Sequence, residues 1–315
     1  MLHAFPNHEF LENLKGCCSE LVVSAADITG RGNEGVIVMT SDAVRKIYGS
    51  AETKRSLSSY SREQSALFSL SGGNHRHFVL PQLKSATIFQ SAFSLDGISY
   101  TAMIEQSRIR GEVPRFETAG EQKKLGMALG EFHLFLKDKA VEGLQTIGNL
   151  LRLRINMISD KGNEKTLLKP GARKRLLHDL DEASKAAPEH VNVHGDFRPG
   201  NFLYDSDADV MGILDLTTIG QSLPEQDFAH MAGLPPEKLG NIFNGYKDIT
   251  GYRPRKSVVQ KLHLLDIAVA MNCAAASRNI TGAQSLRKRF DAVWNIAYKE
   301  DKSAGTTPTC ASGPC

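Results

Sequence analysis

A short polar run near the middle of the chain brings together residue types that suit phosphoryl transfer. The run reads His-Gly-Asp-Phe-Arg-Pro-Gly-Asn and contains Asp196 and Asn201, and Asp215 follows fourteen residues later, after the apolar run Met-Gly-Ile-Leu. Transfer from a nucleoside triphosphate needs one carboxylate to orient the acceptor hydroxyl. It also needs an amide oxygen and a second carboxylate to hold magnesium against the phosphates. Each part alone is typical of a turn or a cap, but their joint order and spacing indicate this chemistry.

This segment resembles the catalytic loop of the aminoglycoside phosphotransferase-like family of small-molecule kinases, which reads His-Gly-Asp, four residues, Asn. The resemblance covers roughly residues 28 to 300 and is most specific between 194 and 227. It implies an α+β, bilobal protein-kinase-like fold, with a small antiparallel-β N-lobe carrying one helix and a large, mainly helical C-lobe. It also implies an enzyme that moves the γ-phosphoryl of ATP, with Mg²⁺, to a hydroxyl of an antibiotic, sugar or metabolite.

The resemblance makes Asp196 the catalytic base or orienting carboxylate, and Asn201 and Asp215 the magnesium ligands. Because the transition state is loose, Asp196 would mainly aim the hydroxyl in line with the γ-phosphate. Arg198 has two interpretations: a contact to the γ-phosphate, or a loop arginine paired with a nearby acid. His194 is expected to brace the loop.

Three glycines near the N-terminus, Gly30, Gly32 and Gly35, form a Gly-x-Gly-x-x-Gly pattern. This pattern marks either a dinucleotide-binding fold or a kinase phosphate loop. Residues 36–39 continue as a strand rather than a helix, which favours a hairpin whose backbone amides close over the phosphates. A hairpin that uses glycines only for its turn is the alternative.

Lys46 sits where the resemblance places the lysine that binds the α- and β-phosphates, with Arg45 as the alternative. Strand alternation puts Val44 and Lys46 on one face. Val44 and Ile37 would then form an apolar roof over adenine. Glu63 lies on the one early predicted helix and would pair with Lys46, unless it belongs to a solvated helix face.

The run from Tyr100 to Gln106 looks like the last N-lobe strand leading into the interlobe hinge. The resemblance implies that the carbonyl of Ile104 and the amide of Gln106 bind the adenine edge, with Met103 behind it. A methionine in an apolar strand is also typical of a core position. Since the hinge would recognise the purine through backbone groups, GTP remains possible as the donor.

Two departures from protein kinases favour a small acceptor. Asp215 is followed by Leu-Thr-Thr instead of Phe-Gly. Asp227, which resembles the family's second acidic residue, comes only twelve residues later and leaves no room for a peptide-binding segment. A kinase-like nucleotide-binding regulatory protein without turnover, or a protein kinase, stays as the alternative.

The surrounding pattern predicts the elements that must position these residues. Strands are expected at 36–39, 43–48, 77–80, 86–89, 92–95 and 100–104, with one helix at 59–70. Helical spacing follows around 125–136, 176–180, 258–269 and 286–297. The predicted divisions are an N-terminal extension at 1–27, the nucleotide-binding lobe at 28–104, the catalytic and acceptor-binding lobe at 105–302, and a disordered tail at 303–315.

Composition narrows the class of protein. The 315 residues carry a formal net charge of +3, too small to imply nucleic acid or an anionic membrane, and a cytoplasmic location is expected. Five cysteines without metal or disulfide spacing are expected to be reduced. Residues 237–300 contain eleven Lys or Arg and five Asp or Glu, an excess of +6 that predicts an acceptor that is not strongly cationic.

Overall fold

Two compact units make up the chain. The computed structural model describes residues 12–14, 28–32, 35–71, 75–95, 97–139, 146–159, 168, 170–187, 190–276 and 279–303. Packing groups residues 1–148, 192–220 and 235–253 into a first unit. Residues 149–191, 221–234 and 254–315 form a second unit.

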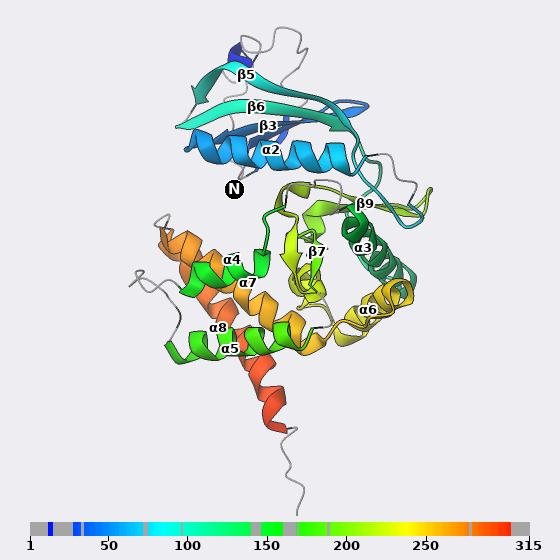
Figure 1. The fold of residues 1–315 in the computed structure, drawn as a ribbon, viewed down its shortest axis with the longest axis vertical. Coiled ribbons are helices and arrows are strands. Elements are labelled where there is room, and N and C mark those ends of the chain that lie inside the picture. The colour runs from blue at the N-terminus through cyan, green and yellow to red at the C-terminus, as the bar shows by residue number, and fades with distance from the viewer. Residues whose placement is uncertain are drawn as a thin grey trace, which may run out of the picture. The chain divides into compact units, whose positions relative to one another are not determined.

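A five-stranded antiparallel sheet organises the N-terminal part of the first unit (Figure 1). Its order is β1-β2-β3-β6-β5, with β1 Ile28–Gly32, β2 Gly35–Met39, β3 Ala43–Ser50, β5 Leu83–Leu95 and β6 Ile98–Ser107. Helix α2, Thr53–Ser69, packs on β3 and β6.

The two faces of this sheet have different tasks. Ile47 and Met103 are register partners and join Val36, Val38 and neighbouring aromatic residues in a buried apolar cluster. Lys46 alternates with Ile47 and therefore points to the other face, where α2 packs. One face thus supplies stability, while the other presents polar side chains to α2 and to the space beside it.

Short strands and two closely packed helices complete the first unit. The hairpin of β8 Phe202–Asp205 and β9 Val210–Ile213 pairs with β4 Phe78–Val79. Helices α3 Ala119–Lys139 and α6 Pro236–Thr250 pack together at two glycines. A Cβ on Gly126 would lie 1.9 Å from the carbonyl oxygen of Ile242, and one on Gly245 would lie 1.9 Å from that of Lys123. Only glycine permits this approach.

The second unit is helical. It consists of α4 Leu150–Ser159, α5 Pro170–Lys185, the 3₁₀ segment η5 Pro224–Met231, α7 Lys256–Ala276 and α8 Ile280–Ser303. Leucines of α5 and α7 and Phe290 of α8 form its core. By length and composition, residues 256–275 of α7 would suffice to cross a membrane, but 56% of the apolar stretch is buried inside the protein. Packing in this core accounts for its apolar character.

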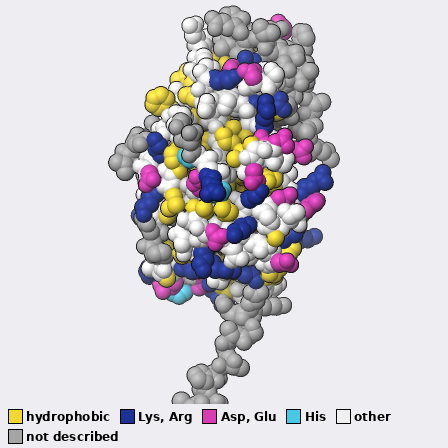
Figure 2. All heavy atoms as spheres, turned by 90° about the vertical axis from the view of Figure 1, so that its right-hand side faces the viewer, with side chains coloured by type: hydrophobic (Ala, Val, Ile, Leu, Met, Phe, Trp, Pro, Cys, Tyr) yellow, Lys and Arg dark blue, Asp and Glu magenta, His cyan; other side chains and the backbone are white. Residues whose placement is uncertain are grey.

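The described surface mixes both signs of charge. On the face shown in Figure 2, basic and acidic side chains are interspersed between apolar ones. This agrees with the small net charge and shows why a bulk charge count cannot locate a binding surface.

The predicted α+β class is confirmed, with differences in detail. The predicted strands at 86–89 and 92–95 belong to one strand, β5, whose register is irregular between Ile88 and Phe93. Helix α2 begins six residues before the predicted start, at Thr53. Helices α4 and α6 were not predicted; α6 contains two glycines and begins at the second of two consecutive prolines. The lobe boundary at 104/105 stays a prediction, and most of 1–27 and 303–315 lies outside the described residues.

Candidate functional site

A cavity of about 590 Å³ lies within the first unit and collects most of the predicted site residues. Its walls come from the sheet, α2, the segment after β6, the 194–201 loop and the segment after β9. The lining residues are Gly35, Ile37, Met39, Val44, Lys46, Arg55, Glu63, Gln106, Ser107, Arg108, Ile109, Gly111, Asp196, Arg198, Gly200, Asn201, Leu203, Leu214, Asp215, Thr217 and Thr218.

The 194–201 loop holds its aspartate by internal hydrogen bonds. Gly195 adopts a φ of 85°, a left-handed conformation that favours glycine and makes the turn into Asp196. Asn201 donates from Nδ2 to the carbonyl oxygen of Asp196 at 2.8 Å and to its Oδ2 at 3.0 Å. The Arg198 Nε lies 3.0 Å from the same Oδ2. Arg198 is therefore paired with a nearby acid in this structure, as one of its two interpretations predicted.

The β8–β9 hairpin brings Asn201 and Asp215 close together at its open end. Phe202 pairs with Ile213, and the Leu214 amide donates to the Asn201 carbonyl oxygen at 2.8 Å. Asp215 follows with a φ of 58°, an uncommon left-handed conformation for a residue other than glycine. Local backbone strain of this kind is often retained at functional sites.

His194 is fully buried and links these two segments. Its Nε2 lies 2.7 Å from the carbonyl oxygen of Leu214, and its Nδ1 lies 3.3 Å from the Asp196 amide. These contacts fit Nε2 as a hydrogen-bond donor and Nδ1 as an acceptor. The histidine thus braces the loop against the residue before Asp215, as expected.

Lys46 lies between two carboxylates. Its Nζ is 2.8 Å from Glu63 Oε2 on α2 and 2.9 Å from Asp215 Oδ1. Tyr48, two residues along β3 and so on the same face, donates its hydroxyl to Glu63 Oε2. Arg45 points to the other face and pairs with Glu105 at 2.7 Å. The structure therefore brings Lys46, and not Arg45, to the cavity.

The two carboxyl groups respond differently to this shared lysine. Burial raises the pKa of Glu63, and the Lys46 ammonium and the Tyr48 hydroxyl only partly oppose it. Burial also acts to raise the pKa of Asp215, but Lys46 and the Thr217 hydroxyl outweigh it and hold that pKa at about 2. Asp215 is thus firmly anionic near neutral pH, as a metal ligand should be.

Oxygen ligands for a hard cation are available beside Asp196. Asp215 Oδ2 and Asn201 Oδ1 accept no hydrogen bond from the residues that the structure describes. In the same part of the chain, no three His, Cys, Asp or Glu residues lie close enough to hold a metal alone. An amide and a carboxylate oxygen suit Mg²⁺ that takes its remaining ligands from phosphates and water.

The glycine-rich segment forms the predicted hairpin. Gly30 and Gly32 lie in β1, and Gly32 pairs with Gly35 of β2, while the turn residues 33 and 34 lie outside the described part. A Cβ at Gly35, whose φ is 151°, would lie 1.8 Å from the Ile47 carbonyl oxygen, so glycine is required there. Ile37 pairs with Lys46 across the sheet, and both Ile37 and Val44 line the cavity.

Two of the predicted hinge residues do not reach the cavity. Met103 belongs to the apolar cluster on the other face, and Ile104 is fully buried opposite Lys46; neither lines the cavity. Strand β6 continues to Ser107, three residues beyond the predicted strand end. The lining segment is Ser107 to Ile109 together with the Gln106 side chain.

Some lining residues were missed by sequence reasoning. Thr217 donates to Asp215 Oδ1 at 2.8 Å. Its hydroxyl two positions after that aspartate was the signal in the sequence that could have identified it. Leu203 and Leu214 contribute apolar walls next to Asn201 and Asp215.

Asp227 is completely buried in η5 of the second unit.

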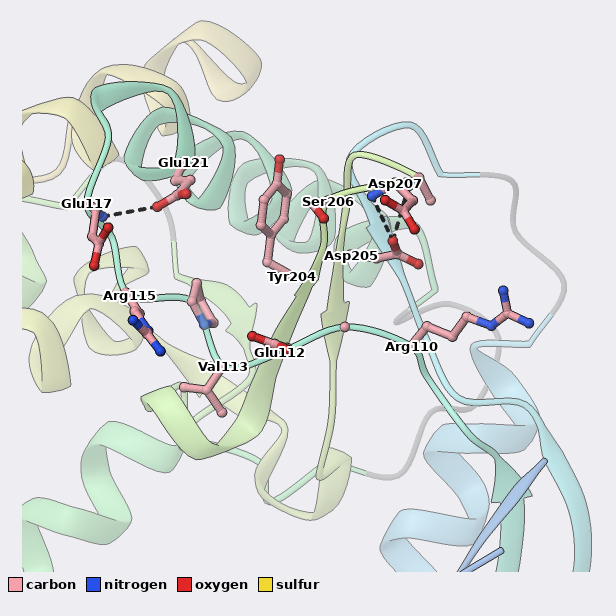
Figure 3. Close-up of a pocket in the computed structure, with 13 residues that line it drawn as sticks. Arg110, Glu112, Val113, Arg115, Glu117, Glu121, Tyr204, Asp205, Ser206 and Asp207 are labelled. Atoms are coloured by element: carbon pink, nitrogen blue, oxygen red, sulfur yellow. Dashed lines mark hydrogen bonds between the residues drawn. The ribbon is translucent and has the colours of Figure 1, made fainter. Parts of the chain in front are cut away.

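A second cavity, of about 780 Å³, lies in the same unit beside the segment that follows β6 (Figure 3). The segment is attached to β8 by two backbone hydrogen bonds between Glu112 and Tyr204. Five acidic and two basic side chains line this cavity: Glu112, Glu117, Glu121, Asp205, Asp207, Arg110 and Arg115. Each of them is exposed or half-buried.

Solved structures of several phosphotransferases are similar to this chain. Among solved structures, APH(2″)-IIIa in complex with GDP and kanamycin matches with a TM-score of 0.67 and 15% identity, over 94% of this chain and 99% of that one. The macrolide 2′-phosphotransferase MphH from Brachybacterium faecium matches with 0.58 and 15%, over 88% and 95%. Amicoumacin kinase hAmiN, in complex with AMP-PNP, Ca²⁺ and its ligand, matches with 0.59 and 11%, over 94% of each.

These structural similarities establish the kinase-like fold, and the sequence itself establishes the family. No curated protein matches the chain. The model of the APH phosphotransferase enzyme family, however, matches residues 91–257, more than half of the chain. The matched range contains the 194–201 loop, Asp215 and Asp227. The chain therefore belongs to the APH phosphotransferase enzyme family.

Proposed function

We propose that this protein transfers the γ-phosphoryl group of ATP to a hydroxyl of a small molecule, with Mg²⁺. The observation that carries the proposal is the position of Lys46. It lies between Glu63 and Asp215, in the same cavity as Asp196 and Asn201. A buried lysine that bridges two acids, next to the polar 194–201 loop, suits the binding of both a phosphate and a metal ion.

Each residue has a distinct role in this proposal. Glu63 orients Lys46 toward the α- and β-phosphates, and Asn201 and Asp215 supply oxygens to Mg²⁺. The ion, when bound, would neutralise charge that develops on the phosphates. Asp196 accepts the hydroxyl proton or aims the hydroxyl oxygen at phosphorus. Arg198, on the same loop, would turn from Asp196 toward the transferred group.

The purine would lie at the apolar end of the cavity. Ile37 and Val44 contribute one wall, and Leu203 is the apolar residue from the catalytic hairpin. Because β6 extends to Ser107, we propose that backbone groups of residues 107–109 bind the base edge, instead of the Ile104 carbonyl and the Gln106 amide. The hairpin of Gly30, Gly32 and Gly35 would cover the phosphates.

The acceptor class stays broad. The solved neighbours include enzymes in complex with kanamycin and with amicoumacin, and a macrolide phosphotransferase. The prediction that the acceptor is not strongly cationic, which rested on the basic excess at 237–300, is not supported, because similar enzymes bind aminoglycosides, which are cationic. The charge count includes side chains that pair with each other on one helix, such as Arg287 with Asp291, and it does not identify the residues that contact the acceptor. We propose a hydroxyl-bearing antibiotic or metabolite and a cytoplasmic site of action.

A coupled turnover assay tests the proposal. Purified protein with Mg²⁺ and ATP or GTP is challenged with aminoglycosides, macrolides, sugars and amino alcohols, with Asp196→Asn as the inactive comparison. Asp207→Asn in the second cavity is the matched control, because it makes the same change of charge outside the site. Stimulation by one class, lost only in Asp196→Asn, supports the proposal.

Two results would contradict it. Nucleotide binding without transfer to any compound favours a kinase-like regulatory protein. Labelling of a partner protein by γ-labelled ATP, with no labelled small molecule, favours a protein kinase.

A further inference from the structure

Helix α2 reaches both partners of the Lys46–Asp215 ion pair through two adjacent residues. Glu63 binds Lys46 at 2.8 Å. Arg62, the residue before it, donates from Nε to the carbonyl oxygen of Thr217 at 3.0 Å. Thr217 follows Asp215 by two positions and is only 2% exposed. One residue of α2 therefore contacts the lysine, and its neighbour contacts the segment that carries the aspartate.

The Arg62 guanidinium is held by its own helix. Its Nη1 donates to the Ser58 hydroxyl at 2.7 Å, and its Nη2 to the Ser59 hydroxyl at 3.4 Å. These serines lie four and three residues earlier, which is one turn of the helix. A planar guanidinium that is fixed at two nitrogens has its third, Nε, in a defined direction. The half-buried Arg62 is thus oriented toward the Thr217 carbonyl before any ligand binds.

Thr217 is bound at its hydroxyl as well as at its carbonyl. It lies in the 3₁₀ turn η4, Leu216–Thr218, which packs against α2. Its hydroxyl donates to Asp215 Oδ1 at 2.8 Å, and Lys46 Nζ lies 2.9 Å from the same oxygen. Two donors on Oδ1 restrict rotation of the carboxyl group and leave Oδ2 for a cation. Because Arg62 fixes the Thr217 carbonyl, the position of the Thr217 hydroxyl depends on Arg62.

We propose that Arg62 is a positioning residue for Asp215: it holds Thr217 so that the carboxylate presents Oδ2 to Mg²⁺. This inference rests on the proposed nucleotide and metal site. Arg62 does not line the cavity, so it acts through Thr217 and not on the ligand. Hydrogen bonds that orient a metal ligand commonly raise the affinity for the ion by about 10- to 100-fold. Loss of Arg62 should therefore weaken the contribution of Mg²⁺ to nucleotide binding and spare that of the nucleotide itself.

Binding measurements with and without metal test this, and they need no acceptor. ATP and GTP are titrated into the protein by calorimetry, once with Mg²⁺ and once with EDTA. The quantity compared is the metal factor, by which Mg²⁺ lowers the Kd of the tighter-binding nucleotide. In Arg62→Met the metal factor should fall about tenfold, whereas the Kd in EDTA should change by no more than about twofold. Arg62→Lys keeps one donor for the Thr217 carbonyl and should give an intermediate metal factor.

Arg253→Met is the matched control. Arg253 is an exposed arginine of the same unit, and it donates to Asn244 Oδ1 at 2.7 Å. Its replacement should leave the metal factor unchanged. The melting temperature of each nucleotide-free variant reports whether the variant is folded. A lowered melting temperature in Arg62→Met with an unchanged metal factor would show that Arg62 is merely structural and would overturn the inference.

A double-variant cycle tests whether Arg62 acts through Thr217. Thr217→Val removes the hydroxyl that binds Asp215 and should by itself lower the metal factor about tenfold. If both residues belong to one chain of contacts, addition of Arg62→Met to Thr217→Val should lower the factor by less than about threefold more. A double variant in which the two single effects multiply in full would overturn the inference.

The remaining outcomes separate this inference from the proposed function. The expected metal factors without phosphoryl transfer to any acceptor support Arg62 and count against the phosphotransferase. Phosphoryl transfer with a metal factor that Arg62→Met leaves unchanged overturns the role of Arg62 alone. A native protein that binds neither nucleotide, or binds both equally well with Mg²⁺ and with EDTA, overturns the metal site and the inference together.

Discussion

The two cavities of the first unit differ in a way that volume does not reveal. The second cavity is the larger, at about 780 Å³ against about 590 Å³, yet each charged side chain that lines it is exposed or half-buried. The smaller cavity contains Lys46 and Glu63, of which 9% and 1% are exposed. Withdrawal of charge from water is costly, so buried charges indicate a site more reliably than the size of a hollow does.

The contrast extends to how the carboxylates are held. In the second cavity, Asp205 accepts hydrogen bonds from the backbone amides of Asp207 and Ala208, and these bonds stabilise the turn between β8 and β9. In the smaller cavity, Lys46 holds Glu63 of another element and the distant Asp215, whose Oδ2 accepts no hydrogen bond from the described residues. Local hydrogen bonds build a turn, whereas side chains from distant segments build a reactive centre.

Among substitutions in the two cavities, replacement of Asp196 in the smaller one should cause the largest loss of activity. Asp196→Asn removes the group that orients the acceptor hydroxyl, so kcat for the acceptor found in the turnover assay should fall by about 10²–10⁴. Nucleotide affinity should change little, since Asp196 does not contact the phosphates in our proposal. Retention of more than a tenth of the native kcat would remove Asp196 from the catalytic role.

Loss of Lys46 should affect both activity and stability. Lys46→Met leaves the buried Glu63 and the half-buried Asp215 without their shared cation, which should lower the free energy of unfolding by about 3 kcal/mol, the lower end for broken buried pairs. Urea unfolding measures this, and kcat/KM should fall in parallel. In Lys46→Met with Glu63→Gln, much of the stability should return and the activity should not. A double variant that recovers activity would contradict the phosphate-binding role.

Asp215 should give a pH-dependent effect of intermediate size. Its pKa is lowered from 3.8 to about 2, so its stabilisation is present above pH 3.8 and is lost as the pH falls toward 2. The native protein should exceed Asp215→Asn in free energy of unfolding by ~2 kcal/mol at pH 6, and this difference should shrink between pH 4 and pH 2. A difference independent of pH over that range would show that Lys46 does not stabilise the Asp215 carboxylate.

The smallest effects should come from the second cavity. Glu112→Gln and Asp207→Asn replace exposed carboxylates, so each should change kcat/KM by no more than about twofold and stability by no more than ~0.5 kcal/mol. Steady-state kinetics and thermal unfolding measure both. A tenfold loss of activity in either variant would break the contrast and make the larger cavity part of the functional site.

The sequence by itself singled out the 194–201 loop and the strand-borne Asp215, because these residues are recognised by type and by spacing along one hairpin, and it narrowed the lysine to Lys46 or its alternative Arg45. Alternation along β3 was enough to place Val44 and Lys46 on one face. The class of fold followed from the change from strand to helical periodicity.

Only the tertiary structure decided what depends on register and on distant partners. The pairing of β6 with β3 places the Met103 side chain in the apolar cluster and the Gln106 side chain in the cavity wall. The pattern of residues within this apolar strand could not show which side chain faces which way. The pairing of Lys46 with Glu63 depended on where α2 packs, and its pairing with Asp215 on where the segment after β9 lies. Spacing along the chain specifies local chemistry, whereas burial and partners arise only when segments far apart in sequence pack together.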